Sequence, residues 1–412
     1  MRSGLLIAGA VWALWVANFN DLGLGGTDPL RPFSFLRLMF GEVDRASGYQ
    51  FGLAFLWSPF YAVGKLLSAA GVESIGGEPA GIAMIALGMS LLVLVICALL
   101  VPVLRAMEFR HGGFVLFAAV FGSPLFFYGS ITMGLSHVAD TLLYTSLVFL
   151  LYRYFRSPQP SLWLPTAMGA IAGYAATVRL FNGFAAVALV IGFAAYRRLS
   201  AAGVFGVVAA GTFLALSSIP IALGASLTGG YAEGTAAAVR GTFAFRPQNV
   251  LLMLFSDRNG LFLWTPATLL GVIGFILLIR HRREDRPFLA LTGALALSVV
   301  LPYVGVRFWT GQGFSERYFT PVFPLVVLGL AELVRRTPRV TIPLLLLAAT
   351  WSVALVFMGP SGVGRITDER GGASWLVRDF VTGRVTPTEY AHGVYHRGRI
   401  SRNLFSDPVD HG

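Results

Sequence analysis

Long apolar runs, separated by short polar segments, follow one another along most of the chain. Because a helix needs about 20 apolar residues to cross the hydrocarbon core of a bilayer, these runs predict an all-α, polytopic helical membrane protein with about eleven transmembrane helices. The first run lacks a small-x-small cleavage pattern before the polar loop that follows, so we interpret it as a retained span and not as a signal peptide. We place the spans near residues 5–19, 80–103, 113–128, 137–152, 162–178, 182–196, 203–224, 261–279, 287–306, 319–334 and 340–358.

One apolar segment, FGLAFLWSPFYAVGKLL at residues 51–67, is ambiguous because it is short, contains Pro59 and carries Lys65 near its end. If this segment lies along the outer surface, the short basic connections all fall on one side of the membrane, as the positive-inside rule requires. We therefore predict a juxtamembrane surface helix here, with the N-terminus in the cytoplasm and residues 359–412 outside. The basic positions that decide this topology are Arg105, Arg110, Arg153, Arg156, Arg197, Arg198 and the segments 280–286 and 335–339.

Composition agrees with the membrane class and limits the partners. The 412 residues are 56% hydrophobic and only 12% charged, with a formal net charge of +11. A basic balance is also typical of nucleic-acid binding, but these arginines lie mostly in short loops between apolar runs. Membrane topology accounts for them, so we expect no nucleic-acid partner. The single cysteine, Cys97, excludes a disulfide framework and a cysteine metal cluster.

The longer polar segments fall on the predicted outer face. They are the first outer loop 20–79, the loops 225–260 and 307–318, and the tail 359–412, which follows a single transmembrane domain at 1–358. Since the predicted cytoplasmic connections are all short, we expect the chemistry to take place at the outer leaflet. No internal repeat is visible in the sequence, which weighs against transporter folds built from duplicated halves.

Two aspartates in the first outer loop are candidates for a carboxylate site. Asp28 precedes Pro29 in GGTDPLRPFSFLR, where glycines and prolines shape a sharp entry into a short helix. The side chain of Asp28 either caps that helix or belongs to a tightly shaped site. Asp21 directly follows the first span and is the alternative.

Arg179, in the segment ATVRLFNG, is the most informative charged residue. It lies between two apolar runs in a turn too short to be a free loop. A charge at membrane depth costs several kcal/mol unless it is paired, which makes such a residue a functional candidate by default. Arginine also suits bidentate phosphate binding. The alternatives are an arginine that extends to the membrane interface and a structural ion pair.

His137 and Asp140, in YGSITMGLSHVAD, are three residues apart and would share one face of a helix. Two such residues are a weak metal signal and are more simply explained as a satisfied interfacial pair, so we predict no metal site. Further candidates lie at the other predicted outer helix ends: Tyr128, Asn182, Arg258, Glu316, Arg317 and Tyr318.

Five segments, in this order, resemble the GT-C superfamily of membrane glycosyltransferases. They are TDPLRPFSFLRLMFGEVD with GYQFGLAFLWSPFYAVG, then YGSITMGLSHVAD, GYAATVRLFNG, RNGLFLWTP and GFSERYF. Within the superfamily, the chain is most similar to bacterial relatives of the protein mannosyltransferases and to the aminoarabinose transferases. The resemblance covers about residues 1–330. Leu180 replaces the proline usual in the third segment, and the first loop lacks the paired acidic residues of these families.

The resemblance implies transfer of a sugar from a polyprenyl-phosphate donor to an acceptor hydroxyl, at the outer face of a bacterial inner membrane. Arg179, with Arg258 or Arg317, would bind the donor phosphate, and a first-loop carboxylate, Asp28 before Asp21, would be the general base. The acceptor, which is a glycan, a lipid or a protein, stays open. Since some relatives use a divalent metal, such a cofactor stays open here, although no convincing ligand set appears in the sequence.

Two other classes of function use similar residues. A transporter or flippase for a lipid-linked sugar would be expected to show symmetric halves and polar residues deep in several spans, whereas here the polar residues gather at one face. A membrane ligase acting on a diphosphate-linked glycan would also use outer arginines. It differs in its product, because it releases polyprenyl diphosphate in place of the monophosphate.

Overall fold

The computed structural model describes residues 2–19, 30–46, 51–131, 134–223, 248–257, 259–304, 315, 317–358, 373, 378, 381 and 382. Between the helices of this part lies one hairpin, in which β1 (Ser74–Ile75) pairs antiparallel with β2 (Glu78–Pro79). Gly76 and Gly77 form its turn with φ angles of 62° and 85°, a conformation that favours glycine.

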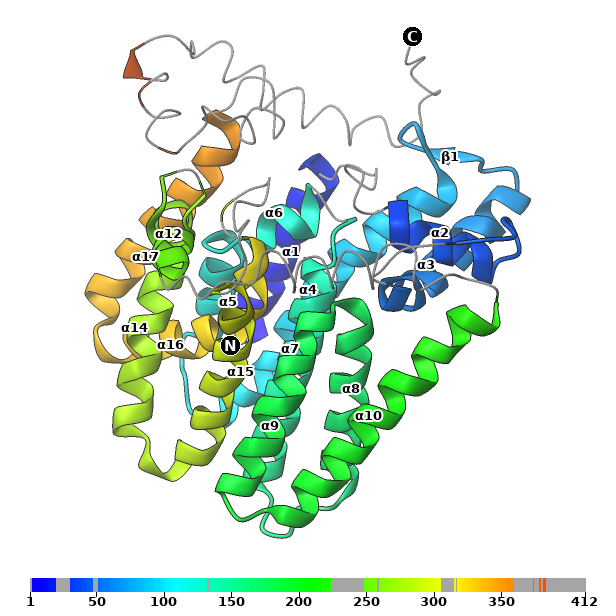
Figure 1. Ribbon diagram of the computed structural model, residues 1–412. Helices are drawn as coiled ribbons and strands as arrows, with labels where there is room; N and C mark the ends of the chain where they lie inside the picture. Colours follow the sequence, from blue (N-terminus) through cyan, green and yellow to red (C-terminus); the bar gives the residue numbers. More distant parts are fainter. Residues whose placement is uncertain are drawn as a thin grey trace.

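Helices make up the rest of the fold (Figure 1). In chain order they are α1 (Arg2–Phe19), α2 (Leu30–Met39), α3 (Phe51–Ala69), α4 (Ala80–Ala106), α5 (Gly112–Phe121), α6 (Leu125–Ser130), α7 (His137–Arg156), α8 (Trp163–Val178), η1 (Leu180–Asn182), α9 (Gly183–Ala195), α10 (Leu199–Ala222), α12 (Gln248–Phe255), α13 (Leu261–Trp264), α14 (Pro266–His281), η3 (Arg283–Asp285), α15 (Arg286–Val304), η4 (Arg317–Val322), α16 (Phe323–Arg336) and α17 (Pro338–Met358), where η marks a 3-10 helix. The predicted all-α fold class is confirmed.

Several of these helices have the length and composition of membrane spans. Within the described residues, five stretches qualify: Ala80–Ala106, Leu199–Ala222, Arg283–Pro302, Arg317–Arg336 and Pro338–Leu355. Shorter apolar helices lie at Leu6–Ala17, Gly112–Phe121, Leu180–Ala195 and Pro266–His281. Helix α3 confirms the helix predicted at 51–67 and is not among the five, while its orientation to the membrane stays a prediction.

Two predicted spans are each divided into two helices. The run 113–128 forms α5 and α6, and the run 261–279 forms α13 and α14. A proline follows each break, Pro124 in the first case and Pro266 in the second, and proline cannot donate the backbone hydrogen bond that would continue a helix. Gly122, at the first break, packs against the side chain of Ala267. This contact leaves no room for a larger residue at position 122.

Small residues allow the helices to pack closely, which matters because apolar lipid gives helices little hydrophobic reason to associate. Gly169 and Gly173, four residues apart on α8, face backbone atoms of α10. Gly271 and Gly274 on α14 meet Gly329 and its neighbours on α16 in the same way. The first of these contacts anchors α8, whose last residues lead into Arg179.

Three basic connections meet at one end of the bundle, at the lower edge of Figure 1. Arg156 Nη2 lies 2.8 Å from Asp285 Oδ1, and Arg282 Nη2 donates a hydrogen bond of 2.7 Å to the carbonyl oxygen of Met107. These contacts join the ends of α4, α7 and α14. These three basic connections therefore share an end, while the sidedness of the chain stays a prediction.

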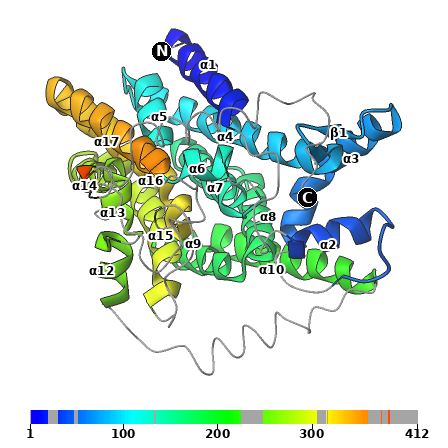
Figure 2. The same cartoon turned by 90° about the horizontal axis from the view of Figure 1, so that it is seen from above.

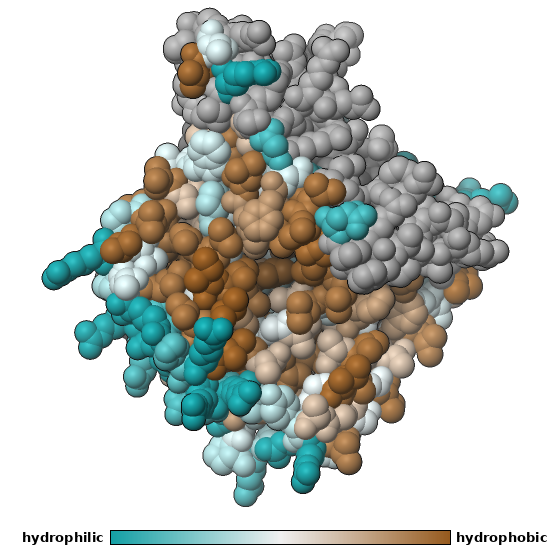
Figure 3. Space-filling model, turned by 60° about the vertical axis from the view of Figure 1, so that its left-hand side comes forward, coloured by the Kyte–Doolittle hydropathy of each residue, from teal (hydrophilic) through white to brown (hydrophobic). Residues whose placement is uncertain are grey.

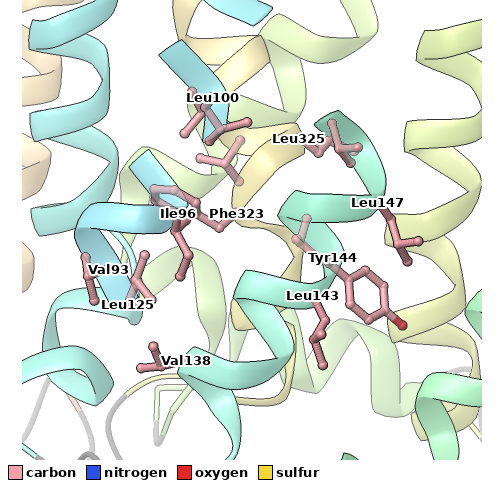
Figure 4. Close-up of a cluster of buried hydrophobic side chains, with 14 of the residues drawn as sticks. Val93, Ile96, Leu100, Leu125, Val138, Leu143, Tyr144, Leu147, Phe323 and Leu325 are labelled. Atoms are coloured by element: carbon pink, nitrogen blue, oxygen red, sulfur yellow. The ribbon is translucent and has the colours of Figure 1, made fainter. Parts of the chain in front are cut away.

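Figure 3 shows one face of the molecule, where apolar side chains form a broad band and hydrophilic ones gather at its lower edge. Figure 2 shows α1 at the periphery, with α7 and α8 nearer the middle. The core between α4, α7 and α16 is apolar (Figure 4). It includes Val93, Ile96 and Leu100 from α4, Val138, Leu143, Tyr144 and Leu147 from α7, Leu125 from α6, and Phe323 and Leu325 from α16.

Candidate functional site

A charged cluster lies at the other end of the bundle, where the first turn of α7 meets the last turn of α8. Asp140, on α7, is fully buried. Its Oδ2 lies 3.2 Å from Nε of Arg179, and its Oδ1 accepts a hydrogen bond of 2.7 Å from Nδ2 of Asn182. The two helices form an antiparallel pair joined by a short connection, so residues about 40 positions apart meet here.

Arg179 and Asn182 are placed by the turn between α8 and α9. The helix ends at Val178, and Arg179 has an extended backbone with φ −146° and ψ 130°. Asn182 then closes the turn, since its backbone N–H donates to Arg179 O (2.9 Å) and its side chain donates to Ala175 O (3.0 Å). Because Asn182 bonds to both α8 and Asp140, it fixes the turn against α7.

His137 is also fully buried and contacts the same arginine. Nη2 of Arg179 lies 3.3 Å from Nδ1 and 3.4 Å from Nε2 of the imidazole. The near-equal distances place the guanidinium on the Cε1 side or over the face of the ring, and not on the lone pair of one nitrogen. The Tyr128 ring, at 4.6 Å between centroids, packs against His137 and completes this wall of the site.

Tyr318, at the start of η4, brings a second arginine to the cluster. The Arg179 guanidinium carbon lies 5.3 Å from the centre of the Tyr318 ring, and that of Arg317 lies 5.1 Å from it. Arg317 Nη2 also donates to the Tyr318 hydroxyl at 3.3 Å. The two distances to the ring centre, 5.3 and 5.1 Å, are in the range of cation–π attraction. One aromatic ring therefore holds two guanidinium groups near each other.

Two guanidinium groups converge in this cluster. Those of Arg179 and Arg317 lie on the same Tyr318 ring, and the Asp140 carboxylate pairs with Arg179. Like charges repel at short range, and a bound anion lowers that repulsion. Phosphate suits such a place, because guanidinium groups bind its oxygens with charge-assisted hydrogen bonds.

The structure thus brings together seven predicted site residues: Tyr128, His137, Asp140, Arg179, Asn182, Arg317 and Tyr318. Four others, Asp21, Asp28, Arg258 and Glu316, lie outside the described residues, and their roles stay predictions.

Two polar residues behind Arg317 escaped the sequence argument. Ser315 is buried, has a φ of 53°, and its hydroxyl lies 3.5 Å from that of Thr265 at the break between α13 and α14. Thr265 also contacts the Thr268 hydroxyl at 2.9 Å. A serine in the left-handed region is uncommon and marks a constrained backbone. The signal available in the sequence was the segment WTPAT, whose hydroxyls were not considered.

Within the described part of the chain, no three His, Cys, Asp or Glu side chains lie close enough together to hold a metal ion. An apolar groove of about 550 Å³ is lined by α1, α5 and α17, from Val11 and Trp15 to Val353. It contains none of the seven residues of the charged cluster.

The helix bundle defines an all-α, polytopic membrane protein. No family model matches the chain, and a search of curated proteins also finds no match. Among solved structures, the chain is similar to the apo crystal structure of ArnT from Cupriavidus metallidurans, with a TM-score of 0.51 and 16% sequence identity over 97% of this chain and 76% of that one. At this identity the likeness shows the fold alone: the chain has the fold of ArnT, in agreement with the fold that the resemblance to the GT-C superfamily implied.

Proposed function

We propose that this protein is a glycosyltransferase that moves a sugar from a polyprenyl-phosphate donor to an acceptor hydroxyl at the outer face of a bacterial inner membrane. The fold supports the general class, since ArnT is a transferase with the same architecture. The observation that carries the proposal is the convergence of Arg179 and Arg317 on Tyr318, beside the buried carboxylate of Asp140.

Arg179 and Arg317 bind the donor phosphate. Arg258, at another predicted outer helix end, is a further candidate. Because Asp140 and Asn182 hold the turn that carries Arg179, its guanidinium is oriented before the donor arrives. Hydrogen-bond donors that are already in position stabilise a developing charge without a cost of reorganisation at the moment of reaction. The charge that develops here is that of the leaving phosphate.

A carboxylate of the first outer loop, Asp28 with Asp21 as the alternative, takes the proton from the acceptor hydroxyl. The acceptor oxygen then forms a bond to the anomeric carbon. The bond from that carbon to the phosphate oxygen breaks, and the polyprenyl phosphate leaves with the electron pair. Direct displacement of this kind inverts the configuration of the anomeric carbon.

The test is a transfer assay with purified protein in lipid nanodiscs and a panel of radiolabelled polyprenyl-monophosphate sugars. Arg179→Ala and Asp28→Asn should each abolish label transfer without loss of membrane expression. Near-normal turnover by both variants would refute the site assignment. In a parallel assay with diphosphate-linked donors, release of polyprenyl diphosphate would indicate a ligase. In sealed proteoliposomes, movement of unreacted donor across the bilayer would indicate a flippase.

A further inference from the structure

The two helices of the first outer loop are connected to the Arg179 turn by an unbroken series of contacts. Helix α2 packs on α3, and the first turn of α3 packs on the last turn of α8. The loop that supplies the proposed base leads directly into α2 at Leu30. The position of α2 and α3 relative to the Arg179 turn therefore depends on these two junctions.

The junction between α2 and α3 is held by aromatic and ionic contacts around Tyr61. The rings of Phe33 and Phe40 meet the Tyr61 ring edge-on at 5.8 and 5.0 Å. The Tyr61 hydroxyl donates to Glu42, with both carboxylate oxygens at 2.8 Å, and Lys65 Nζ lies 2.9 Å from the same carboxylate. These contacts make α2 and α3 one body.

The junction between α3 and α8 centres on Gly52 and Tyr174. The Tyr174 hydroxyl donates a hydrogen bond of 2.8 Å to the carbonyl oxygen of Gly52. A Cβ atom on Gly52 would lie 2.6 Å from the carbonyl carbon of Thr177 and 2.7 Å from the backbone nitrogen of Val178, and it would also meet the Thr177 hydroxyl. Only a residue without a side chain allows this approach, because the neighbouring atoms are backbone.

Thr177 and Val178 are the two residues directly before Arg179, so the junction lies at the base of the turn that presents the guanidinium. A displacement of α3 at Gly52 would shift Thr177 and Val178, which lie within two residues of Arg179. Asp140 and Asn182 hold Arg179 from the opposite side, through α7. The arginine is therefore anchored to α7 by contacts that do not involve α3.

We propose that Gly52 and Tyr174 are positioning residues that set the separation between the α2–α3 pair and the turn that carries the donor-phosphate arginine. This inference rests on the proposed function, since it assigns the two halves of the site to base and phosphate. Gly52 sets how closely α3 approaches α8, and the Tyr174 hydroxyl sets its register along α8. Neither residue touches the substrate in this scheme.

Two substitutions change the junction in different ways. Gly52→Ala forces α3 away from α8, and Tyr174→Phe removes the hydrogen bond while keeping the ring. Because a misplacement of about 1 Å can cost about 100-fold in rate, kcat should fall by about 10- to 100-fold in Gly52→Ala and by less in Tyr174→Phe. The KM for the donor should change little, because the contacts of Arg179 with Asp140 and Asn182 are kept.

The chain offers matched controls for both changes. Gly203, on α10, has no atom within 4 Å of an added Cβ, so Gly203→Ala should leave kcat unchanged. Tyr196, at the opposite end of the bundle, is 37% exposed, and Tyr196→Phe should also be neutral. A Gly52→Ala protein with the kcat of the wild type would overturn the inference. So would a loss of thermal stability in both junction variants with no change in kcat, because that result shows a purely structural role.

A distance measurement separates this inference from the proposed function. In a Cys97→Ala background, spin labels at Leu66→Cys on α3 and Phe184→Cys on α9 report the separation of α3 from α9. Gly52→Ala should lengthen or broaden the distance distribution, and Gly203→Ala should not. If the wild type transfers no sugar from any donor, the proposed function fails but this measurement still decides the junction. An unchanged distribution in Gly52→Ala overturns the inference.

Discussion

The two ends of the helix bundle each contain a buried aspartate paired with arginine, but the pairs are built differently. At one end, Asp140 is 0% exposed and pairs with Arg179, which is 13% exposed. At the other end, Asp285 is 4% exposed and pairs with Arg156, which is 43% exposed. The first arginine is enclosed in the protein, whereas the second reaches solvent.

The arginines at the basic end are held by groups that satisfy them locally. Arg282 donates to the carbonyl oxygen of Met107 and lies over the Phe109 ring at 5.4 Å. In α16, the buried Glu332 accepts from Arg335 at 2.7 and 2.8 Å and from Arg336 at 2.6 Å, all within one helical turn. Such contacts join or cap neighbouring segments and need no ligand.

The other end differs in how its second guanidinium is held. At the basic end, Arg282 Nη1 lies 3.9 Å from the same Asp285 carboxylate that pairs with Arg156, whereas here Arg317 joins Arg179 on the neutral Tyr318 ring. A buried carboxylate with arginine partners is thus no functional signal by itself, because both ends have one. The convergence of two guanidinium groups on a neutral ring is the feature by which we separate the proposed anion site from a structural ion pair.

The largest effect should come from Arg179→Ala. Removal of one preorganised donor from a developing negative charge typically costs about 10²- to 10³-fold in kcat, and we expect a loss of sugar transfer of that size or larger. The assay is turnover of radiolabelled polyprenyl-monophosphate sugar in nanodiscs, with size-exclusion chromatography to verify folding.

Arg156→Ala is the matched control at the basic end. It removes an arginine from a similarly buried aspartate, Asp285. It should retain transfer within about twofold, because the basic end binds no anion in this scheme. Equal losses of transfer in Arg179→Ala and Arg156→Ala would remove the distinction between the two ends.

Much of the fold followed from the spacing of apolar runs, which reports burial in lipid but not local breaks. Each predicted span coincides with one helix or a pair of helices, and the separate helix predicted at 51–67 is found at Phe51–Ala69. The breaks after α5 and α13 were missed, although Pro124 and Pro266 are visible in the sequence. Apolar residues continue across both breaks, so hydropathy alone gives no sign of them.

The site followed only in part. Arg179 was selected because an unpaired charge is costly at membrane depth, and the structure shows that the paired alternative also holds, through Asp140. The sequence argument had grouped Asp140 with His137, since residues three apart share a helix face. The contact with Arg179 depends on α7 and α8 forming an antiparallel pair, which is a property of tertiary packing and not of local spacing.

An intermediate effect should come from replacing each buried aspartate by its amide. Asp140→Asn leaves Arg179 enclosed without its counter-charge, so we expect a loss of about 3 kcal/mol in the free energy of unfolding together with a fall in transfer. Asp285→Asn should cost less, about 1 kcal/mol, because Arg156 can turn to solvent, and it should leave transfer unchanged. Reversible unfolding in mixed micelles measures the first quantity, and the nanodisc assay measures the second.

The order of the two losses is the decisive outcome of that experiment. If Asp285→Asn destabilises the protein more than Asp140→Asn, enclosure of the arginine is not what separates the two pairs. If Asp140→Asn keeps full transfer, the aspartate contributes only to folding, and Arg179 does not depend on it for its orientation.

The smallest effect should come from Glu42, a carboxylate of the predicted first outer loop that is 22% exposed and surrounded by hydrogen-bond donors. Burial acts to raise its pKa, but the hydrogen bonds from Lys65 and Tyr61 outweigh burial, so the pKa lies below its ordinary value of 4.5. A lowered pKa in the folded state means that the charged form stabilises the protein above pH 4.5, and that this contribution is lost as the pH falls through the lower, folded-state value.

Glu42→Gln should therefore be less stable than the wild type at pH 7, by about 0.5 to 1 kcal/mol, and the difference should shrink below pH 4.5. Unfolding midpoints in micelles between pH 7 and 3 test this, with sugar transfer at pH 7 expected to stay near the wild-type rate. A stability gap that persists at the lowest pH would show that the amide disturbs packing, and a large loss of transfer would place Glu42 with Asp140 and not with the structural pairs of the basic end.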